Sequence, residues 1–256
     1  QGSNYGWIVG GSSNSTPSTN SIERYPFSAP SSSTDVGEIN HPGSTYAWLR
    51  GSVRNDDYAF FWDGIQSSDN IWRMPFTAPA TFTDVGEIIQ TNPPGTAWDS
   101  SSGATDGTYG FRMGGKRGPG QAWTDMVQKI TLDSPATCVD TGANLTAGRY
   151  SGHGLSDITN GYMYSVLGSQ AVTPSTPAYG LHVDTIEKGS FSISSGTFSD
   201  VGEGQNAMYS TQGSCSETYG YTAGGFFYDN LAPPAVYYST IEKWPFTSDG
   251  NATDVG

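Results

Sequence analysis

Short apolar stretches alternate with polar, glycine-rich segments along the whole chain, and their order repeats five times. Each repeat opens with a Tyr-led stretch; the first copy reads Tyr5-Gly6-Trp7-Ile8-Val9 and ends on two glycines. The Tyr–x–aromatic spacing puts two rings on one face, because side chains of a strand alternate with period two. We therefore predict a strand after each opening tyrosine, which are Tyr5, Tyr58, Tyr109, Tyr162 and Tyr219.

A second stretch in each repeat carries one basic residue and ends on an apolar one, as in Ile22-Glu23-Arg24-Tyr25-Pro26-Phe27. The two lie three positions apart, so a strand would place them on opposite faces. The basic residues are Arg24, Arg73, Lys129, Lys188 and Lys243. The terminal apolar residues, which we expect in the core, are Phe27, Phe76, Leu132, Phe191 and Phe246.

A third stretch follows at a nearly constant interval and reads Thr-Asp-Val-Gly-Glu in its first two copies, with Asp140-Thr141-Gly142 in place of Asp-Val-Gly in the third; its aspartates are Asp35, Asp84, Asp140, Asp200 and Asp254. A fixed interval suits a hairpin whose register is set. Sheets that bury both faces require a partner for any charge on them. We expect each basic residue of the second stretch to pair with one of these aspartates. The alternative is a basic stem that lies over an aromatic ring with its charge in solvent.

A fourth strand can be placed before the opening tyrosine, at 46–49, 96–98, 149–151 and 207–209. Four strands in a repeat of about 50 residues are typical of a propeller blade. The sequence predicts an all-β chain, with 1–256 as a single β-propeller domain built from repeats 1–44, 45–95, 96–147, 148–206 and 207–256. Only four fourth strands are found, so either one of five blades has three strands, or further chain completes it, or the ring is larger and incomplete.

Composition agrees with many short strands and tight turns: the chain has 34 Gly and 15 Pro, and aromatic residues make up 13%. The net charge of −13 opposes binding to nucleic acid or to an anionic membrane surface. No apolar run approaches the ~20 residues that cross a bilayer. We expect no nucleic-acid partner and no membrane insertion.

Candidate chemistry is sparse. His41, His153 and His182 lack metal-ligand spacing, and no Gly-x-Ser-x-Gly motif is present. We expect no catalytic residue, no metal and no cofactor. Cys138 and Cys215 either form one bridge between repeats or remain thiols.

The segments between the glycine pair and the basic stretch vary in length and are rich in aromatic residues. Such loops on a rigid frame commonly carry recognition, and exposed rings suit both protein docking and stacking on sugars. The candidate binding residues are Trp123, Tyr179, His182, Phe226, Phe227, Tyr228, Tyr237 and Tyr238. They either bind a sugar, dock another protein or pack on one another.

The glycine doublet after an aromatic strand resembles kelch-type β-propeller repeats. A narrower resemblance is carried by Tyr-Gly-Tyr-Thr-Ala-Gly-Gly at 219–225, Ile-Glu-Lys-Trp-Pro-Phe at 241–246 and Asn-Ala-Thr-Asp-Val-Gly at 251–256. These segments resemble the kelch-like repeats of tail and appendage proteins of marine bacteriophages. The resemblance implies a non-enzymatic virion or extracellular protein that engages partner subunits or host-surface glycan, with an oligomer as one form. A secreted adhesin of the same fold is the alternative, and a kelch-like copper oxidase is a third reading.

Overall fold

The computed structural model describes residues 4–11, 19–28, 32–39, 51–62, 69–89, 98–117, 123–170, 181–227 and 235–256. Within these ranges the chain forms strands, turns and bends, and no helix. The prediction of an all-β chain is confirmed for this part of the sequence. No helix in it is long and apolar enough to cross a membrane.

Five sheets of four main strands or fewer contain most of the chain, and each lies within one predicted repeat. In each sheet the main strands follow one another in chain order. The first sheet contains β1 (Tyr5–Gly11), β2 (Thr19–Pro26) and β3 (Thr34–Glu38); the second contains β4 (Gly51–Arg54), β5 (Tyr58–Trp62), β6 (Asn70–Pro75) and β8 (Thr83–Glu87). The third contains β10 (Ser102–Thr105), β11 (Tyr109–Met113), β13 (Met126–Thr131) and β14 (Cys138–Asn144).

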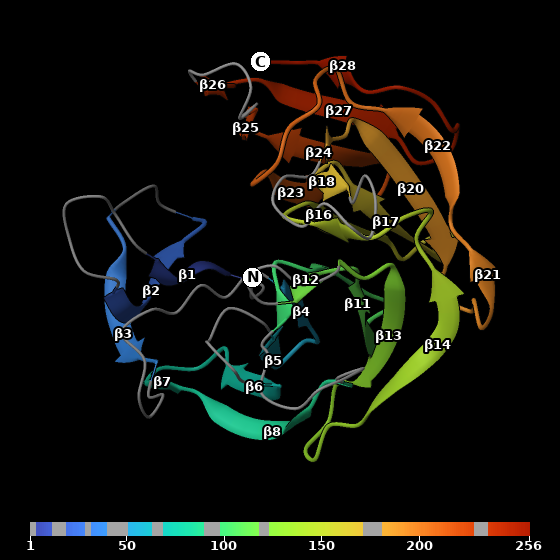
Figure 1. Cartoon of the computed structure of the whole chain (residues 1–256). Helices are drawn as coiled ribbons and strands as arrows, with labels where there is room; N and C mark the ends of the chain where they lie inside the picture. The colour runs from blue at the N-terminus through green and yellow to red at the C-terminus, as the bar shows by residue number, and fades with distance from the viewer. Residues whose placement is uncertain are drawn as a thin grey trace.

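The fourth sheet contains β16 (His153–Asp157), β17 (Tyr162–Val166), β20 (Thr185–Ser190) and β22 (Ser199–Glu203); the fifth contains β23 (Gln212–Cys215), β24 (Tyr219–Ala223), β27 (Ile241–Pro245) and β28 (Thr253–Asp254). Figure 1 shows the five sheets following one another around a common centre, with an opening between the first sheet and the fifth. This arrangement is propeller-like.

Two short strands tie neighbouring sheets together at their outer edges. β7 (Ala80–Thr81) pairs in parallel with β3 of the preceding repeat, and β21 (Gly196–Thr197) pairs in the same way with β14. The second and third sheets are joined there by a hydrogen bond from the Ala136 amide to the Val85 carbonyl at 2.6 Å, and the fourth and fifth by one from the Ala252 amide to the Glu203 carbonyl at 2.8 Å. Each sheet is therefore anchored to its neighbour both at the core and at the rim.

In the second to fifth sheets the inner strand begins later than the sequence predicted. The segments expected to supply it, as far as they are described, lie in small ribbons outside the main sheets, and the inner strands are β4, β10, β16 and β23. The segment 46–49 lies outside the described residues. The reason for the shift is a turn: Ser100, Ser151 and Ser210 have left-handed φ values of 58°, 57° and 56°. Each serine redirects the chain between ribbon and inner strand.

Glycine lets the inner strands approach one another closely at the centre. A Cβ on Gly154 would lie 2.2 Å from the Gly103 carbonyl oxygen, and a Cβ on Gly103 would lie 2.5 Å from that of Ser52. Both distances are far below van der Waals contact, so any larger residue would force the strands apart. The centre is thus packed main chain against main chain.

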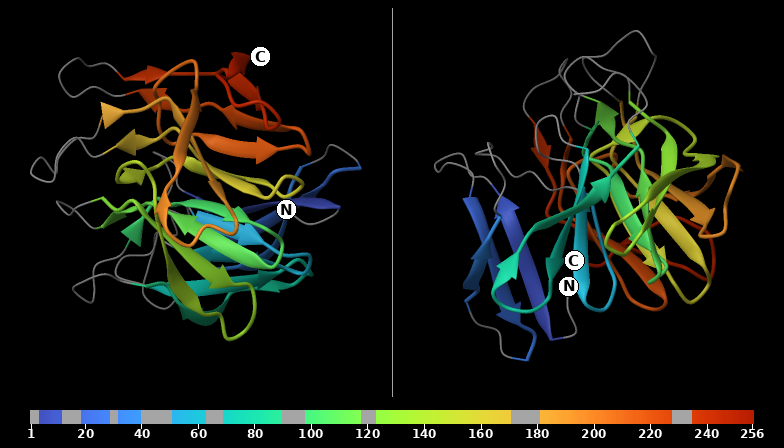
Figure 2. Two further views of the ribbon diagram at one scale, coloured as in Figure 1. Left: turned by 90° about the vertical axis from the view of Figure 1, so that its right-hand side faces the viewer. Right: turned by 90° about the horizontal axis from the view of Figure 1, so that it is seen from below.

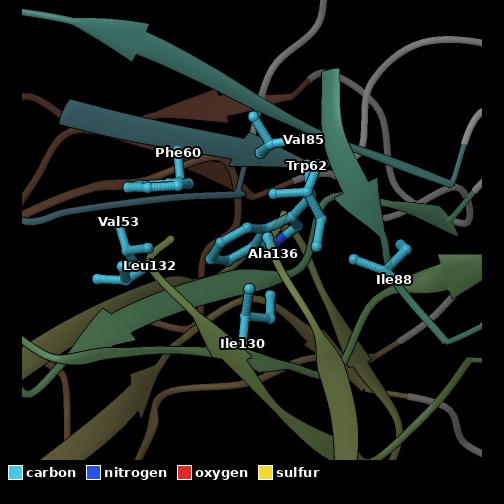
Figure 3. Packing of buried hydrophobic residues seen from close by; sticks show 9 residues of the cluster. Val53, Phe60, Trp62, Val85, Ile88, Ile130, Leu132 and Ala136 are labelled. Carbon is cyan, nitrogen blue, oxygen red and sulfur yellow. The ribbon is translucent and has the colours of Figure 1, made fainter. Parts of the chain in front are cut away.

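The apolar core lies between successive sheets. Figure 3 shows one such layer, in which Val53, Phe60 and Trp62 of the second sheet face Ile130 and Leu132 of the third. Every one of these five side chains is buried. Burying a large apolar side chain contributes about 1.5–3 kcal/mol, so these layers hold neighbouring sheets together.

The terminal apolar residues of the second stretch occupy this core unequally. Phe246 and Leu132 are 3% and 5% exposed, as predicted, whereas Phe27 is 46% exposed. Phe246 stacks on Tyr164 of the preceding sheet at 5.1 Å between ring centroids. Phe27 belongs to the first sheet, which has no preceding sheet among the described residues, so its ring stays open to solvent.

The five basic residues of the second stretch lie over tyrosine rings, and the expected pairs with the recurrent aspartates do not form. In each repeat the charged group sits above the opening tyrosine of its own sheet. The distances to the ring centroid are 4.5 Å for Arg24, 4.4 Å for Arg73, 3.6 Å for Lys129, 4.2 Å for Lys188 and 4.7 Å for Lys243. The register explains the difference: Arg24 lies opposite Thr34 while Asp35 lies opposite Glu23. Base and aspartate therefore project from opposite faces of the sheet.

The recurrent aspartates have a local role instead. Each accepts a hydrogen bond from the amide of the glycine two residues later, an Asx turn. The distances are 3.1 Å for Asp35, 3.3 Å for Asp84, 2.8 Å for Asp140, 3.3 Å for Asp200 and 3.0 Å for Asp254. The absence of a side chain on these glycines lets the main chain of the next repeat come close: a Cβ on Gly86 would lie 2.4 Å from the Ala136 carbonyl oxygen. The Asp-Val-Gly motif thus shapes the rim where the following sheet attaches.

Candidate functional site: an aromatic face

Three small ribbons stand apart from the main sheets. β12 (Lys116–Arg117) pairs with β9 (Trp98–Asp99), and β15 (Arg149–Tyr150) pairs with β18 (Ser169–Gln170), which pairs with β19 (Leu181–His182). The third ribbon joins β25 (Phe226–Phe227) to β26 (Val236–Tyr237). In the left view of Figure 2 the short strands extend from one side of the sheets. They carry the variable segments that the sequence marked as candidates for recognition.

The rings on these ribbons form one continuous run from the third repeat to the fifth. Trp123 contacts Tyr150 with centroids 4.6 Å apart, and Tyr150 lies 6.5 Å from Tyr209. Tyr209 then stacks on His182 at 4.3 Å and contacts Phe226 at 4.1 Å.

The run ends on two branches. Phe226 stacks on Tyr237 at 5.5 Å, and His182 meets Phe227 edge-on at 5.2 Å. We call this set the aromatic face; its members are Trp123, Tyr150, His182, Tyr209, Phe226, Phe227 and Tyr237.

Most of the aromatic face is half-buried, but its last residues are open. Tyr237 is 78% exposed, and its strand neighbour Val236 is 48% exposed. Leu181, next to His182 on β19, is 60% exposed. An exposed ring at the end of a packed aromatic run, with exposed apolar side chains on the same ribbons, gains free energy by being covered.

The interior beneath this face is polar and firmly hydrogen-bonded. Arg149, adjacent to Tyr150, is buried and forms an ion pair with the equally buried Glu187 of the fourth sheet. Its guanidinium also donates to the Thr185 hydroxyl at 2.5 Å, and the Thr146 amide donates to Glu187 at 3.0 Å. Burial lowers the pKa of Arg149 below its ordinary value, while the Glu187 carboxylate opposes that shift. The ion pair fixes the ribbon that presents Tyr150.

Tyr209 is held by the main chain as well. Its amide and carbonyl exchange two hydrogen bonds with those of Phe226, both 3.1 Å long. The Ser210 amide, one residue later, donates to the Ser151 carbonyl at 2.8 Å. The centre of the run is therefore a preorganised surface, which lowers the entropy lost on binding.

The structure gathers five of the eight predicted binding residues into this face, namely Trp123, His182, Phe226, Phe227 and Tyr237. Tyr238 lies elsewhere: it is half-buried and packs against the core between the fourth and fifth sheets. Its position directly after Tyr237 explains the difference, since successive side chains point to opposite sides. Tyr179 and Tyr228 lie outside the described residues.

Tyr150 and Tyr209 belong to the aromatic face and were missed as binding candidates. Both residues were predicted to lie in the fourth strand of a blade. They stand at the same place in their repeats, each just before a serine with left-handed φ. A serine directly after the tyrosine is therefore the sequence signal that the tyrosine lies in a ribbon and not in the inner strand of a sheet.

The remaining polar candidates do not converge. The His153 Nδ1 lies 2.8 Å from the Thr211 hydroxyl, and the His182 Nδ1 lies 2.6 Å from the Ser169 hydroxyl. Within the described ranges, no three His, Cys, Asp or Glu side chains are grouped so that they could hold a metal ion. Cys138 and Cys215 are free thiols in different sheets, and burial raises the pKa of Cys138.

Comparison with known proteins gives a fold neighbour and no family. No family model matches the chain, and no curated protein matches it. Among solved structures, that of YjhT superposes with a TM-score of 0.68 at 12% sequence identity, covering 99% of this chain and 82% of YjhT. At this identity the likeness concerns the fold alone.

Proposed function

We propose that the chain is a non-enzymatic recognition module built on a five-bladed kelch-like β-propeller, and that its aromatic face docks a partner protein. The observation that carries the proposal is the aromatic run, which ends in the exposed ring of Tyr237. Aromatic residues are enriched in protein interfaces, where buried rings supply much of the binding energy.

A protein partner fits this surface better than a sugar does. Most rings of the run already pack against one another at 4.1 to 6.5 Å, which leaves few ring faces for a sugar. Val236 and Leu181 add aliphatic surface, which suits an apolar protein patch. Host-surface glycan is the second candidate, favoured by the openly exposed ring of Tyr237.

The site of action that we propose is a virion, as a tail or appendage component, or otherwise the outside of a cell. The sequence resemblance to kelch-like repeats of phage tail proteins supports this location. A secreted adhesin is the alternative, and it would use the same face. Antibody labelling of purified particles tests the location: a chain absent from every particle fraction but present in the medium would favour the adhesin.

The docking role is tested with Tyr237→Ala and with Tyr25→Ala as the matched control, since Tyr25 is 38% exposed on the first sheet, outside the aromatic face. We expect Tyr237→Ala to lose incorporation into particles at least about tenfold, which corresponds to 1.4 kcal/mol of interface energy. The control should incorporate normally. A saturable signal on a glycan array that Tyr237→Ala abolishes would replace the protein partner with a sugar.

A further inference from the structure

The fourth and fifth sheets each contain a buried glutamate at the same position of the basic strand. Glu187 and Glu242 are both 0% exposed. Each accepts a main-chain hydrogen bond of 3.0 Å through Oε2, Glu187 from the Thr146 amide and Glu242 from the Gln205 amide. The two carboxylates therefore lie equivalently against the segment that leads into their sheet.

Met208 occupies the position in the fifth repeat that Arg149 occupies in the fourth. The Gly115 amide donates to the Arg149 carbonyl at 2.7 Å, and the Gly168 amide donates to the Met208 carbonyl at 2.9 Å. Both side chains are buried, with exposures of 2% and 0%. Methionine is shorter than arginine and carries no charge, so it does not supply Glu242 with the ion pair that Arg149 forms with Glu187.

The oxygen atoms that accept from the guanidinium in the fourth sheet have unsatisfied counterparts in the fifth. Arg149 donates to the Thr185 hydroxyl at 2.5 Å and to Glu187 Oε1. The corresponding atoms are the Thr240 hydroxyl and Glu242 Oε1. Both atoms are buried and have no hydrogen-bond partner among the described residues. The fifth sheet thus has both acceptors and lacks the guanidinium that would bond to them.

The Thr222 hydroxyl adds a third buried oxygen with no partner in the described ranges. Thr222 lies directly opposite Glu242 in the pairing of β24 with β27. Thr240 lies two residues before Glu242, and a hydrogen bond of 3.1 Å from the Gly224 amide to its carbonyl extends the same pairing. Side chains at these positions project from one face of a sheet, so the three oxygen atoms belong to one site.

The described part of the fifth repeat does not bring a basic side chain to this site. Residues 204–227 and 235–256 contain one basic residue, Lys243. Its amine lies 4.7 Å from the centroid of the Tyr219 ring. Lys243 follows Glu242 directly on β27, so the two side chains point to opposite faces.

The electrostatic surroundings of Glu242 favour a positive charge. Burial raises its pKa, and Asp254, which lies opposite on β28, adds to that rise, while the Gln205 amide and the Asn206 side chain act against it. A buried carboxylate is costly unless it is neutralised. The third sheet has the neutral Gln128 at this position, also 0% exposed. The fifth sheet has a carboxylate there, which requires a proton or a cation.

We propose that Glu242, Thr240 and Thr222 bind a monovalent alkali cation, sodium or potassium, which takes the place of the Arg149 guanidinium of the fourth sheet. A proton on Glu242 can bond to one hydroxyl at most, whereas a cation is coordinated by all three oxygen atoms. The three atoms carry one negative charge between them, which matches a monovalent ion.

A calcium site is a poorer match, because calcium takes about 6–8 oxygen ligands and its tighter sites include several carboxylates. No three acidic, His or Cys side chains are grouped for a metal ion in the described part of the chain. Met208 directly precedes Tyr209 of the aromatic face, so the ion would stabilise the segment that presents this ring. The binding of the ion does not rest on what the aromatic face docks.

Urea denaturation in sodium, potassium or tetramethylammonium chloride of equal ionic strength tests the site, at about pH 8 to limit competition from protons. An ion that binds only the folded chain raises the folding equilibrium constant. We expect sodium or potassium to raise it at least about tenfold over tetramethylammonium, which is too large for the site. Glu242→Gln should abolish this gain. The matched control is Glu217→Gln, which removes an exposed carboxylate of the same repeat and should keep the gain.

Met208→Arg supplies the charge from within the chain. We expect this variant to pair with Glu242 as Arg149 pairs with Glu187, and to be equally stable in all three salts. An equal gain from alkali ions in the unaltered protein and in Glu242→Gln would overturn the proposal. So would the absence of any gain in the unaltered protein, which would leave Glu242 neutralised by a proton.

Anomalous diffraction from crystals of the unaltered protein soaked in rubidium chloride decides the matter if Glu242→Gln does not fold. Rubidium is a heavier alkali ion that replaces potassium. We expect an anomalous peak between Glu242 and Thr240. A map without a peak at this position would overturn the proposal.

Discussion

A tyrosine ring accompanies the basic residue of every repeat, and Lys188 additionally forms an ion pair with Asp249 at 2.9 Å. The basic residue and the tyrosine are diagonal neighbours across a strand pair: Lys243 lies opposite Tyr221 and reaches over Tyr219. Such contacts contribute about 0.5–1 kcal/mol each where they are partly exposed. Because the contact recurs in all five sheets, it contributes to the stability of the whole fold.

Lys243→Met tests the ring contact, because methionine keeps the apolar stem and removes the charge. We expect a loss of about 0.5 kcal/mol in the free energy of unfolding. In a double-mutant cycle Lys243 should couple to Tyr219→Leu by a similar amount and show no coupling to Asp254→Asn. Chemical denaturation of the unaltered protein, the three single variants and the two double variants measures both coupling energies; coupling to Asp254 alone would restore the ion-pair interpretation.

His153 makes the junction of the fourth and fifth sheets sensitive to acid. Its ring is buried between β16 and β23, and burial lowers its pKa from 6.5 to about 3. At pH values between about 3 and 6.5, His153 is protonated in the unfolded chain and neutral in the folded chain. The stability that neutral His153 supports is therefore complete above pH 6.5 and is lost as the pH falls toward 3.

At pH 5 this loss amounts to about 2 kcal/mol relative to pH 7. His153→Asn keeps a polar group near the Thr211 hydroxyl and should remove that loss, as urea denaturation at the two pH values would show. Glu242 acts in the opposite sense, since burial raises its pKa and the folded state retains its proton more strongly. Glu242→Gln should then steepen the acid loss; a variant at His153 with an unchanged pH profile would contradict this account.

At the scale of elements, strands in which apolar and polar residues alternate could be predicted from the sequence, whereas the inner strands, which consist largely of small residues, could not. The tyrosine-led and basic strands were predicted because Tyr219-Gly220-Tyr221 and Ile241-Glu242-Lys243 show period two. The inner strand β23 reads Gln-Gly-Ser-Cys and shows no apolar alternation. Its neighbour β16 meets it through Gly213, where a Cβ would lie 2.0 Å from the His153 ring. Close packing at the centre selects small residues, which carry no periodic signal.

The aromatic face was only partly predictable for a related reason. Trp123 and Tyr237 stand in variable segments, so their sequence context marked them as candidates. Tyr150 and Tyr209 stand in ribbons whose direction depends on a single left-handed serine each. Which rings meet is decided by that turn and by the buried Arg149–Glu187 pair, both of which depend on tertiary packing.

Phe246 and Phe27 occupy the same place in their repeats and offer a test of how one sheet supports the next. Phe246→Ala should cost about 3–5 kcal/mol, because it empties a site packed against Tyr164. Phe27→Ala should cost less than about 1 kcal/mol, because that ring is already half in water. Urea denaturation gives both values. Equal costs would mean that the first sheet is covered in solution.

At the scale of the whole molecule, the two ends of the array expose what every internal junction buries. Ile241 is 43% exposed, whereas its counterparts Ile22, Ile71, Val127 and Ile186 are all 0% exposed. On the other side of the opening Ile8 and Phe27 are 49% and 46% exposed. The first and fifth sheets therefore each have one packed flank, and the internal sheets have two.

This asymmetry predicts the order in which the molecule opens. When each unit contacts only its neighbours, stability is close to a sum of unit and junction terms, so the end units open at the lowest free energy. The first sheet should open first, because Ile22 is the only buried apolar side chain in the described part of β1, β2 and β3, whereas the fifth sheet buries Trp244, Phe246 and Ala252. Native-state hydrogen exchange should show the β1 amides exchanging at least about tenfold faster than those of β11, a difference of 1.4 kcal/mol or more. Exchange of β1, β11 and β24 at one common rate would instead mean that the opening between the first and fifth sheets is closed in solution, with the sheets unfolding as a single unit.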